Sequence, residues 1–581
     1  MSLARPSTLL AALALSLALG GQALEAQGRS GPDDGGAGAY LAARSANFTS
    51  DFDDGRVYLT RALLADPDNV ELMEGLLSAH VAAGDFTSAV PVARKLEQMV
   101  PGQQLAGIVL LGDLMVREDH EAVLARLAEG KPVGGALLDP MLKAWAEMGA
   151  GRMSVAIEEF DKLAARPGLG VFGLYFKALA LGMVGDLEGA DAILSDRANG
   201  LISLRRAVWA HVQVLSQLDR NADALALLDE VFGTSPDPEI DGLRKALSAG
   251  TTLPFDMLRN SRDGAAEVFH MIAVAFQGDA PPVQTLIYSR MAEQLRPDLS
   301  DALLLTAISL EALGQDDLAL GAFERIGPNS PVHLVAETGK AQLLYRSGRK
   351  AEALAAMEAL ARREAKNASV QIAMGDMLRR EDRFGEAAAL YSRAIDIVGP
   401  ADAEAIRWGL YYARAMAWER AGEWGKAEAD FEQALRLSPD QPDVLNYYGY
   451  SLLDRNIRID DALGMIRRAV AQRPEDGHII DSLGWGYFLT GRYPEAVVEI
   501  ERAALLMPVD PVVTDHLGDA YWAVGRQREA QFQWRRALSF KPEEKDAVLI
   551  RRKLAAGLDQ VLVEQKLPAL AGRGQPAAPK K

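Results

Sequence analysis

Apolar residues along this chain of 581 residues recur at the spacing of one helix face, and strand-like alternation persists nowhere. The pattern is most regular between Trp408 and Pro542. Each unit there has an alanine, a large apolar residue four positions later, a second alanine and a closing proline. The four runs are Ala427, Phe431, Ala434 and Pro439; Ala462, Ile466, Ala469 and Pro474; Ala496, Ile500, Ala503 and Pro508; and Ala530, Trp534, Ala537 and Pro542. The closing prolines lie 35, 34 and 34 residues apart, and a fixed period of this length predicts stacked units of an all-α fold.

A second signature precedes three of these runs, with a glycine, often after leucine, and a tyrosine three residues later. Its residues are Gly449, Leu483, Gly484, Tyr487, Leu517, Gly518 and Tyr521. The combined order of Leu-Gly, Tyr, Ala, Phe, Ala and Pro resembles the tetratricopeptide repeat (TPR). The resemblance implies an α–α superhelix, or solenoid, whose first helices line a concave binding surface. We expect about fourteen helix pairs in two halves.

The same period continues upstream, where four alanines spaced by 34 residues mark the contact between the helices of a pair. They are Ala122, Ala156, Ala190 and Ala224. A stretch rich in Pro and Gly then interrupts the period, as expected where helix pairs are broken. We therefore predict five segments: an N-terminal TPR-like solenoid at 39–235, a seam or hinge at 236–264, a C-terminal TPR solenoid at 265–545, a capping helix at 546–566 and a disordered tail at 567–581.

The N-terminus has the pattern of an export signal. Arg5 precedes an apolar run from Leu9 to Leu19, and small residues follow. A run of about eleven residues suits the core of a signal peptide and is too short to span a bilayer. We expect a cleaved signal peptide at 1–26, a flexible spacer at 27–38 and a periplasmic location, with an uncleaved anchor helix as the alternative. The chain has no cysteine, so no lipid anchor is expected.

The charge balance points to the class of partner. The chain has 62 basic and 80 acidic residues, a formal net charge of −18. A net negative charge of this size repels nucleic acid and anionic lipid surfaces and favours encounters with basic partners. The acidic residues are scattered, as on solvated helix faces. We therefore expect other proteins as partners and no nucleic acid.

Two short motifs resemble those of enzymes, but the residues around each of them do not fit the enzyme site. His120 and Glu121 begin like the metalloprotease helix, but Leu124 stands where the second ligand is needed. The glycines at 168, 170 and 173 fit GxGxxG, but a helical pattern precedes them where a dinucleotide site needs a strand, which predicts an inter-repeat loop. We expect no catalytic residue, no metal and no cofactor. A hydrolase that uses carboxylates is the alternative from another class.

Aromatic residues gather in the regular stretch: six of eight tryptophans and eight of fourteen tyrosines lie between 408 and 534. Several fill core positions of the repeat. Aligned by their glycines, the first helices place nine residues on the concave side: Tyr412, Met416, Asn446, Tyr450, Asp481, Trp485, Asp515, Asp519 and Trp522. Aromatic rings beside hydrogen-bonding groups are typical of binding hot spots, and an acidic groove suits a basic or amphipathic segment. Alternatively, Asp481 and Asp515 pair with neighbouring helices and the aromatic rings pad the superhelix.

The order of elements is also similar to that of long bacterial envelope TPR proteins, which include the lipoprotein adaptor of a carboxyl-terminal processing protease. The likeness rests on YARAMAWER from Tyr412, LNYYGY from Leu445, DSLGW from Asp481 and DHLGDAYW from Asp515. It implies a non-catalytic scaffold that delivers substrates to a periplasmic protease. The adaptor carries a lipid on cysteine, and this chain has none. A structural subunit of an envelope secretion or polysaccharide-export assembly is the alternative.

Overall fold

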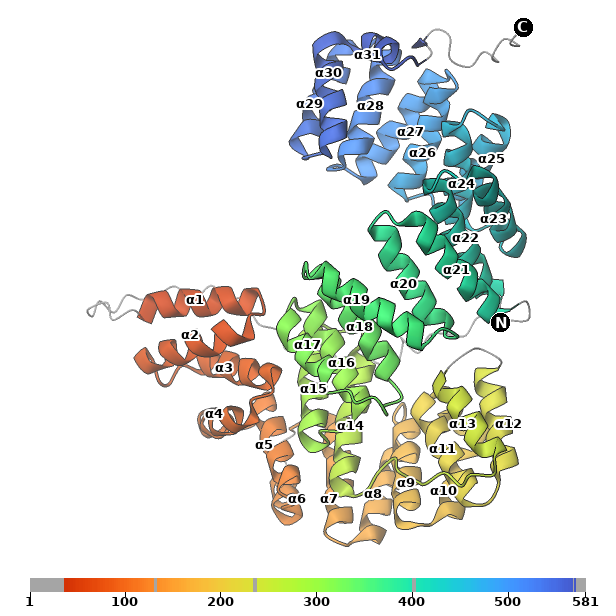
Figure 1. Cartoon of the computed structure of the whole chain (residues 1–581). Helices are drawn as coiled ribbons and strands as arrows, with labels where there is room; N and C mark the ends of the chain where they lie inside the picture. Colours follow the sequence, from red (N-terminus) through yellow and green to blue (C-terminus); the bar gives the residue numbers. More distant parts are fainter. Residues whose placement is uncertain (1–35, 130–132, 234–237, 400–403, 568, 571–581) are drawn as a thin grey trace. The chain divides into compact units, whose positions relative to one another are not determined.

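The computed structural model describes residues 36–129, 133–233, 238–399, 404–567 and 569–570 (Figure 1). The predicted signal peptide and nearly all of the predicted spacer and tail lie outside these residues. Every regular element in the described ranges is a helix, which confirms the all-α prediction. The chain divides into two compact units, 1–364 and 365–581.

The first unit begins with six helix pairs and two 3-10 turns. They are α1 (Gly36–Phe48), α2 (Phe52–Ala65), α3 (Val70–Ala83), α4 (Phe86–Met99), α5 (Gln104–Val116), α6 (His120–Ala128), α7 (Gly135–Gly149), α8 (Met153–Ala164), α9 (Gly170–Val184), α10 (Leu187–Leu194), η2 (Arg197–Asn199), η3 (Leu201–Ser203), α11 (Arg205–Gln217) and α12 (Asn221–Phe232). Of the four periodic alanines, Ala156, Ala190 and Ala224 are fully buried and Ala122 is half-buried.

The pair α3–α4 shows how the sequence sets these boundaries. Asn69 precedes α3, and its Oδ1 accepts a hydrogen bond from the backbone N–H of Leu72 at 3.1 Å. Gly84 ends α3 in the left-handed conformation, with φ of 80°. Asp85 then caps α4 through the N–H of Ser88 at 3.1 Å. The side chains of Asn69 and Asp85 accept hydrogen bonds from N–H groups that have no partner within the helix, and Gly84 adopts the left-handed conformation that ends α3. These residues therefore determine where the helices start and stop.

Seven further helices complete the first unit. They are α13 (Pro238–Ser248), α14 (Ser261–Phe276), α15 (Pro282–Leu295), α16 (Ser300–Ala312), α17 (Asp316–Glu324), α18 (His333–Arg346) and α19 (Lys350–Arg363). Helix α13 packs on α12 without a partner of its own, and the remaining six form three pairs.

The predicted seam at 236–264 does not divide the chain into compact halves. Residues after α13 are held along α11: Leu253 N–H donates to Ser216 Oγ at 2.9 Å, and Gln213 Nε2 donates to Asp256 Oδ1 at 2.6 Å. The segment lies within the first unit, and the division between the two units falls between Glu364 and Ala365 in the sequence. Proline and glycine break the helical period here without breaking the packing.

The packing continues because the chain turns back on itself after this segment. Helix α14 lies against α5, α7 and α9, and α15 lies against α3 and α5 (Figure 1). Gly264 of α14 meets the ring of Trp145 so closely that an added Cβ would lie 2.3 Å from it. Arg290 of α15 donates from Nε to the carbonyl oxygen of Ala82 at 2.9 Å. One apolar core therefore extends from Met73 to Ala302.

The second unit has five helix pairs and two terminal helices. They are α20 (Ala368–Arg380), α21 (Phe384–Val398), α22 (Glu404–Arg420), α23 (Trp424–Leu437), α24 (Pro442–Asp454), α25 (Ile459–Gln472), α26 (Gly477–Leu489), α27 (Tyr493–Leu506), α28 (Pro511–Ala523), α29 (Gln527–Ser539), α30 (Glu544–Ala556) and α31 (Leu558–Glu564). With the nine pairs of the first unit, the described residues contain fourteen pairs, which confirms the predicted number.

Successive repeats of the second unit are joined by a recurring hydrogen bond. An arginine of one second helix donates to the carbonyl oxygen of the proline that closes the preceding repeat. The pairs are Arg468 with Pro439, Arg502 with Pro474, and Arg536 with Pro508. The closing prolines therefore end one repeat and also accept a bond from the next.

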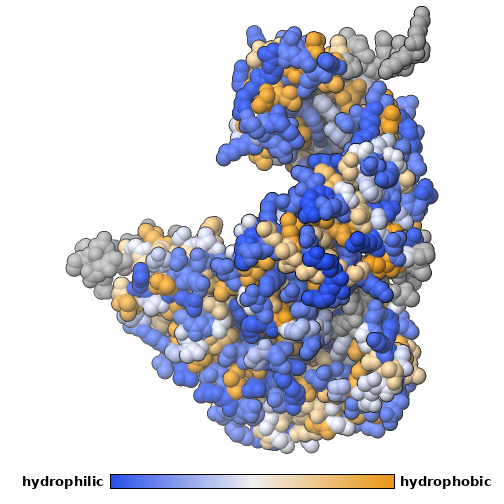
Figure 2. Space-filling view, in the orientation of Figure 1, coloured by the Kyte–Doolittle hydropathy of each residue, from blue (hydrophilic) through white to orange (hydrophobic). Residues whose placement is uncertain are grey.

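The surface seen in Figure 2 is predominantly hydrophilic, with apolar residues interspersed. This agrees with the scattered acidic residues of the sequence. No helix in the described part of the chain is long and apolar enough to cross a membrane.

Candidate functional site

The name inner face is used for the shared surface of four first helices of the second unit, α22, α24, α26 and α28. Helix α26 packs directly on both α24 and α28. The nine residues predicted to bind a partner lie on α22, α24, α26 and α28, and the structure gives them different environments.

An aromatic cluster occupies the α22 end of the inner face. The ring of Tyr412 is half-buried, with its centroid 6.4 Å from Trp408 and 6.0 Å from Tyr447 in an edge contact. Met416, one turn further along α22, is half-buried as well. Tyr412 therefore packs against its aromatic neighbours and keeps only part of its ring accessible to a partner.

Tyr450 and Asn446 follow on α24. The side chain of Tyr450 is 37% exposed, more than any other tyrosine or tryptophan of the predicted site. Asn446 lies one turn earlier, and its Oδ1 is buried without a hydrogen-bond partner among the described residues. The exposed ring of Tyr450 can contact a ligand without rearrangement, whereas the buried Asn446 Oδ1 cannot.

An ion pair between Asp481 of α26 and His516 of α28 lies beside the ring of Trp485. Asp481 Oδ2 lies 2.8 Å from Nδ1 of His516, and the imidazole stacks on Trp485 with ring centroids 4.0 Å apart and planes 14° apart. Trp485 also stacks on Phe488. Asp481 is buried and serves the contact between repeats, which is the local pairing that the sequence left open.

The two acids of α28 are engaged by the terminal helix. Lys553 of α30 donates to Asp515 Oδ2 at 2.8 Å and to Asp519 Oδ2 at 2.7 Å. Asp519 also accepts from Nε1 of Trp534 at 2.9 Å and is only 3% exposed. Asp519 therefore does not face an open groove, because α30 covers it.

Trp522 likewise belongs to the contact with the C-terminal helices. Its Nε1 donates to Asp559 Oδ2 of α31 at 2.8 Å, and an added Cβ on Gly557 would lie 2.6 Å from its ring. Lys553 and His516 were not predicted from the sequence to be site residues. His516 adjoins Asp515 in the repeat, whereas Lys553 lies beyond the last recognisable unit.

Three residues at one register position remain partly unsatisfied. Asn446, Asp481 and Asp515 occupy the same place on α24, α26 and α28, 35 and 34 residues apart. Each has one side-chain oxygen, Oδ1, without a hydrogen-bond partner among the described residues. A buried acceptor without a partner costs about 1–3 kcal/mol, and because these three oxygens are buried, a ligand on the surface does not reach them in this conformation.

Comparison with known proteins agrees with this geometry. Models of the tetratricopeptide repeat match residues 40–103, 338–403 and 408–441.

The chain carries tetratricopeptide repeats.

A TPR repeat-containing protein of Pseudomonas aeruginosa is 29% identical over 180 residues, which are 31% of this chain and 29% of that protein. The match therefore spans less than a third of the relative's length.

Solved structures with some similarity to this chain include the following three. The Cut9–Hcn1 hetero-tetramer of the APC/C is 15% identical, over 90% of this chain and 97% of that chain, with a TM-score of 0.39. Yeast Tom70 is 16% identical, over 92% and 97%, with a TM-score of 0.35. A tetratricopeptide repeat protein from Parabacteroides merdae is 16% identical, over 44% and 97%, with a TM-score of 0.37.

We expect the contacts of α28 to be more stable at pH 5.5 than at pH 8. Burial and the neighbouring Asp515 raise the pKa of Asp519 to about 6 despite Lys553. Burial lowers the pKa of His516, but Asp481, Asp515 and Asp519 raise it more, so it lies above the ordinary value of 6.5. Both groups hold their proton more tightly in the folded chain. The stability they contribute is therefore lost as the pH rises through about 6 and beyond.

Hydrogen exchange of residues 511–556 at the two pH values, corrected for intrinsic exchange rates, measures this effect. His516→Gln should flatten the dependence, whereas His478→Gln, at an exposed position of α26, should leave it unchanged. Equal protection of the unaltered chain at both pH values would contradict the expected titration.

Proposed function

We propose that the inner face of the second unit binds a basic or amphipathic segment of a partner protein, and that the chain is a non-catalytic scaffold of the bacterial cell envelope. TPR repeats typically bind other proteins. The observation that carries the proposal is the exposed ring of Tyr450 on α24, with the partly accessible ring of Trp485 on the neighbouring helix α26.

The charge of the chain supports a basic partner. A net charge of −18 attracts positively charged segments and speeds their association. Aromatic rings with polar neighbours contribute most of the binding energy in many interfaces. A segment with alternating basic and apolar residues would use both properties of the inner face.

We expect Trp485→Ala to weaken binding of an amphipathic lysine–leucine peptide by the full-length chain about tenfold or more, as at an interface hot spot. Fluorescence anisotropy of the labelled peptide measures the dissociation constant. Phe532→Ala is the matched control, because Phe532 is an exposed aromatic residue of α29. The inner-face assignment fails if both variants bind alike, or if a glutamate–leucine peptide binds as tightly.

The envelope location and a role in proteolysis belong to the same proposal. The export signal of residues 1–26 supports a periplasmic location, and cell fractionation with and without this segment tests it. The likeness to envelope adaptors supports delivery of bound partners to a periplasmic processing protease. If the purified chain leaves the cleavage rate of a bound partner unchanged, it does not deliver that partner.

A further inference from the structure

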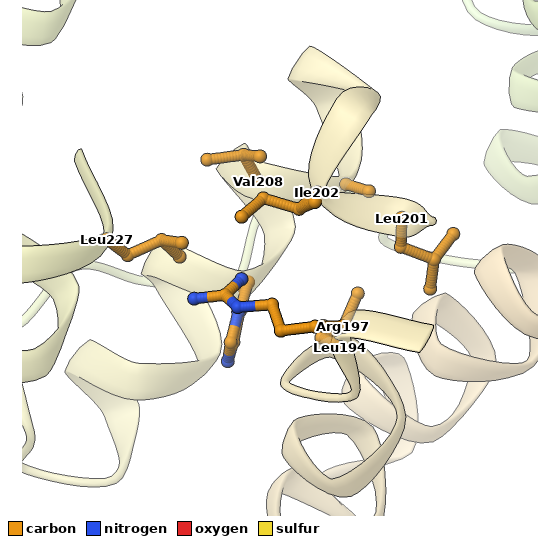
Figure 3. A pocket seen from close by; sticks show the side chains of 8 residues that line it. Leu194, Arg197, Leu201, Ile202, Val208 and Leu227 are labelled. Carbon is orange, nitrogen blue, oxygen red and sulfur yellow. The ribbon is translucent and has the colours of Figure 1, made fainter. Parts of the chain in front are cut away.

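A cavity of about 310 Å³ opens to solvent in the first unit, where α11, α14 and α16 meet. Its lining comprises Tyr175, Leu204, Arg205, Arg206, Glu267, His270, Met271, Val274, Gln277, Asp301, Leu304, Leu305 and Ile308. All of these lining residues belong to the first unit. By contrast, Arg197 extends into the hollow between Leu194 and Leu227 shown in Figure 3, and that hollow has no space for a water molecule.

Ion pairs hold the three helices around the cavity. Arg206 of α11 donates from Nε and one terminal nitrogen to the two carboxylate oxygens of Glu267 on α14, both at 2.6 Å. Its other terminal nitrogen donates to Asp301 Oδ2 of α16 at 2.6 Å. The hydroxyl of Tyr175 adds a bond to Glu267 at 2.8 Å. Since one guanidinium bridges both carboxylates, the spacing of α11, α14 and α16 is fixed and the cavity is preformed.

The protonation state of Glu267 agrees with these ion pairs. Burial alone would raise the pKa of this carboxyl, but Arg206 lowers it to about 2. Glu267 is therefore charged and fully paired at neutral pH. A charged ligand would have to compete with these ion pairs, which makes a neutral ligand the better fit.

The mouth of the cavity is apolar and accessible. Leu304 and Met271 line its wall, and Val274 and Ile308 are 47% and 39% exposed. Sites that take small groups have volumes from about 300 Å³ and are lined mainly by apolar side chains. His270, also in the lining, has a buried Nδ1 without a hydrogen-bond partner among the described residues.

We propose that this cavity binds an uncharged, largely apolar side chain of a partner polypeptide, of the size of leucine or phenylalanine. The preformed volume accepts one such side chain, and the bridged charges of the floor disfavour an ionic one. The exposed Val274 and Ile308 extend the apolar surface beyond the opening. Residues that flank the inserted side chain can pack there, which a free small molecule would not use.

Saturation-transfer NMR with the full-length chain tests the site with three probes: N-acetyl-leucinamide, N-acetyl-phenylalaninamide and N-acetyl-lysinamide. We expect the two apolar probes to bind and compete with each other, and the lysine probe to bind at least about tenfold more weakly. Ile308→Trp and, separately, Val274→Trp fill the mouth and should raise the dissociation constants of the apolar probes about tenfold or more. Val335→Trp is the control, since Val335 is 56% exposed on α18 outside the lining.

A peptide with phenylalanine between glycines distinguishes a side chain of a polypeptide from a free small molecule as the occupant of the cavity. Tighter binding of this peptide than of N-acetyl-phenylalaninamide supports a polypeptide partner, because its flanking residues reach the apolar rim. Equal affinity overturns the polypeptide assignment. Equal binding of the lysine probe, or unchanged binding in both mouth variants when the control is also unchanged, overturns the site.

Discussion

Replacing Lys553 with methionine is expected to lower the local stability of α28–α31 by about 3–5 kcal/mol, the usual cost of removing one partner of a buried ion pair. The side chain of Lys553 is 9% exposed and that of Asp519 is 5% exposed. Methionine keeps much of the apolar stem but leaves the buried Asp519 and the half-buried Asp515 without their cation. Hydrogen exchange of residues 511–564 in the full-length chain measures the opening free energy.

The matched control for this change is Lys545→Met on the same helix. The side chain of Lys545 is 74% exposed and pairs with an equally exposed glutamate, Glu543, so its removal should leave the stability nearly unchanged. Adding Asp519→Asn to Lys553→Met should restore part of the loss, because the double variant no longer buries that unpaired charge. If both lysine variants behave alike, the ion pair does not stabilise the C-terminal end.

Replacing Gly264 with alanine is expected to destabilise the first unit by about 1–3 kcal/mol, the usual cost of overpacking a core. The added Cβ would lie 2.3 Å from the buried ring of Trp145. Either the ring moves or α14 moves away from α7, and both weaken the contact that closes the unit. Thermal unfolding of the full-length chain, followed by calorimetry, reports the loss as an earlier transition.

Gly321→Ala is the control for that substitution. Gly321 lies inside α17, and no neighbouring atom lies within 4 Å of the place that an added Cβ would occupy, so alanine should stabilise the helix by about 0.5–1 kcal/mol. The two variants have the same chemistry and opposite expected signs. A Gly264→Ala chain as stable as the Gly321→Ala chain would show that α14 does not press on Trp145.

The sequence predicted the contacts that recur from repeat to repeat. The alanines at 427, 462, 496 and 530 are fully buried, and Trp534 packs beneath Gly518 as its position implies. These contacts join residues that are close in sequence, so the 34-residue period contains them. The number of helix pairs follows for the same reason.

Contacts that depend on the course of the whole superhelix could not be predicted in this way. The meeting of Trp145 with Gly264 results from many small rotations between repeats, and no spacing in the chain encodes their sum. Lys553 could not be predicted because α30 begins after Pro542, where the regular pattern of the repeat ends. Asp519 therefore looked open in sequence, although α30 covers it in the structure.

The return of α14 onto α7 also has a consequence for synthesis on the ribosome. Domains form from the N-terminus as the chain emerges. Trp145 leaves the ribosome well before Gly264 is made, so the surface that α14 will cover stays open to water while α8–α13 are translated. In the second unit each helix pair can dock on the one before it at once. The nascent first unit is therefore the part of this protein that most needs protection from aggregation.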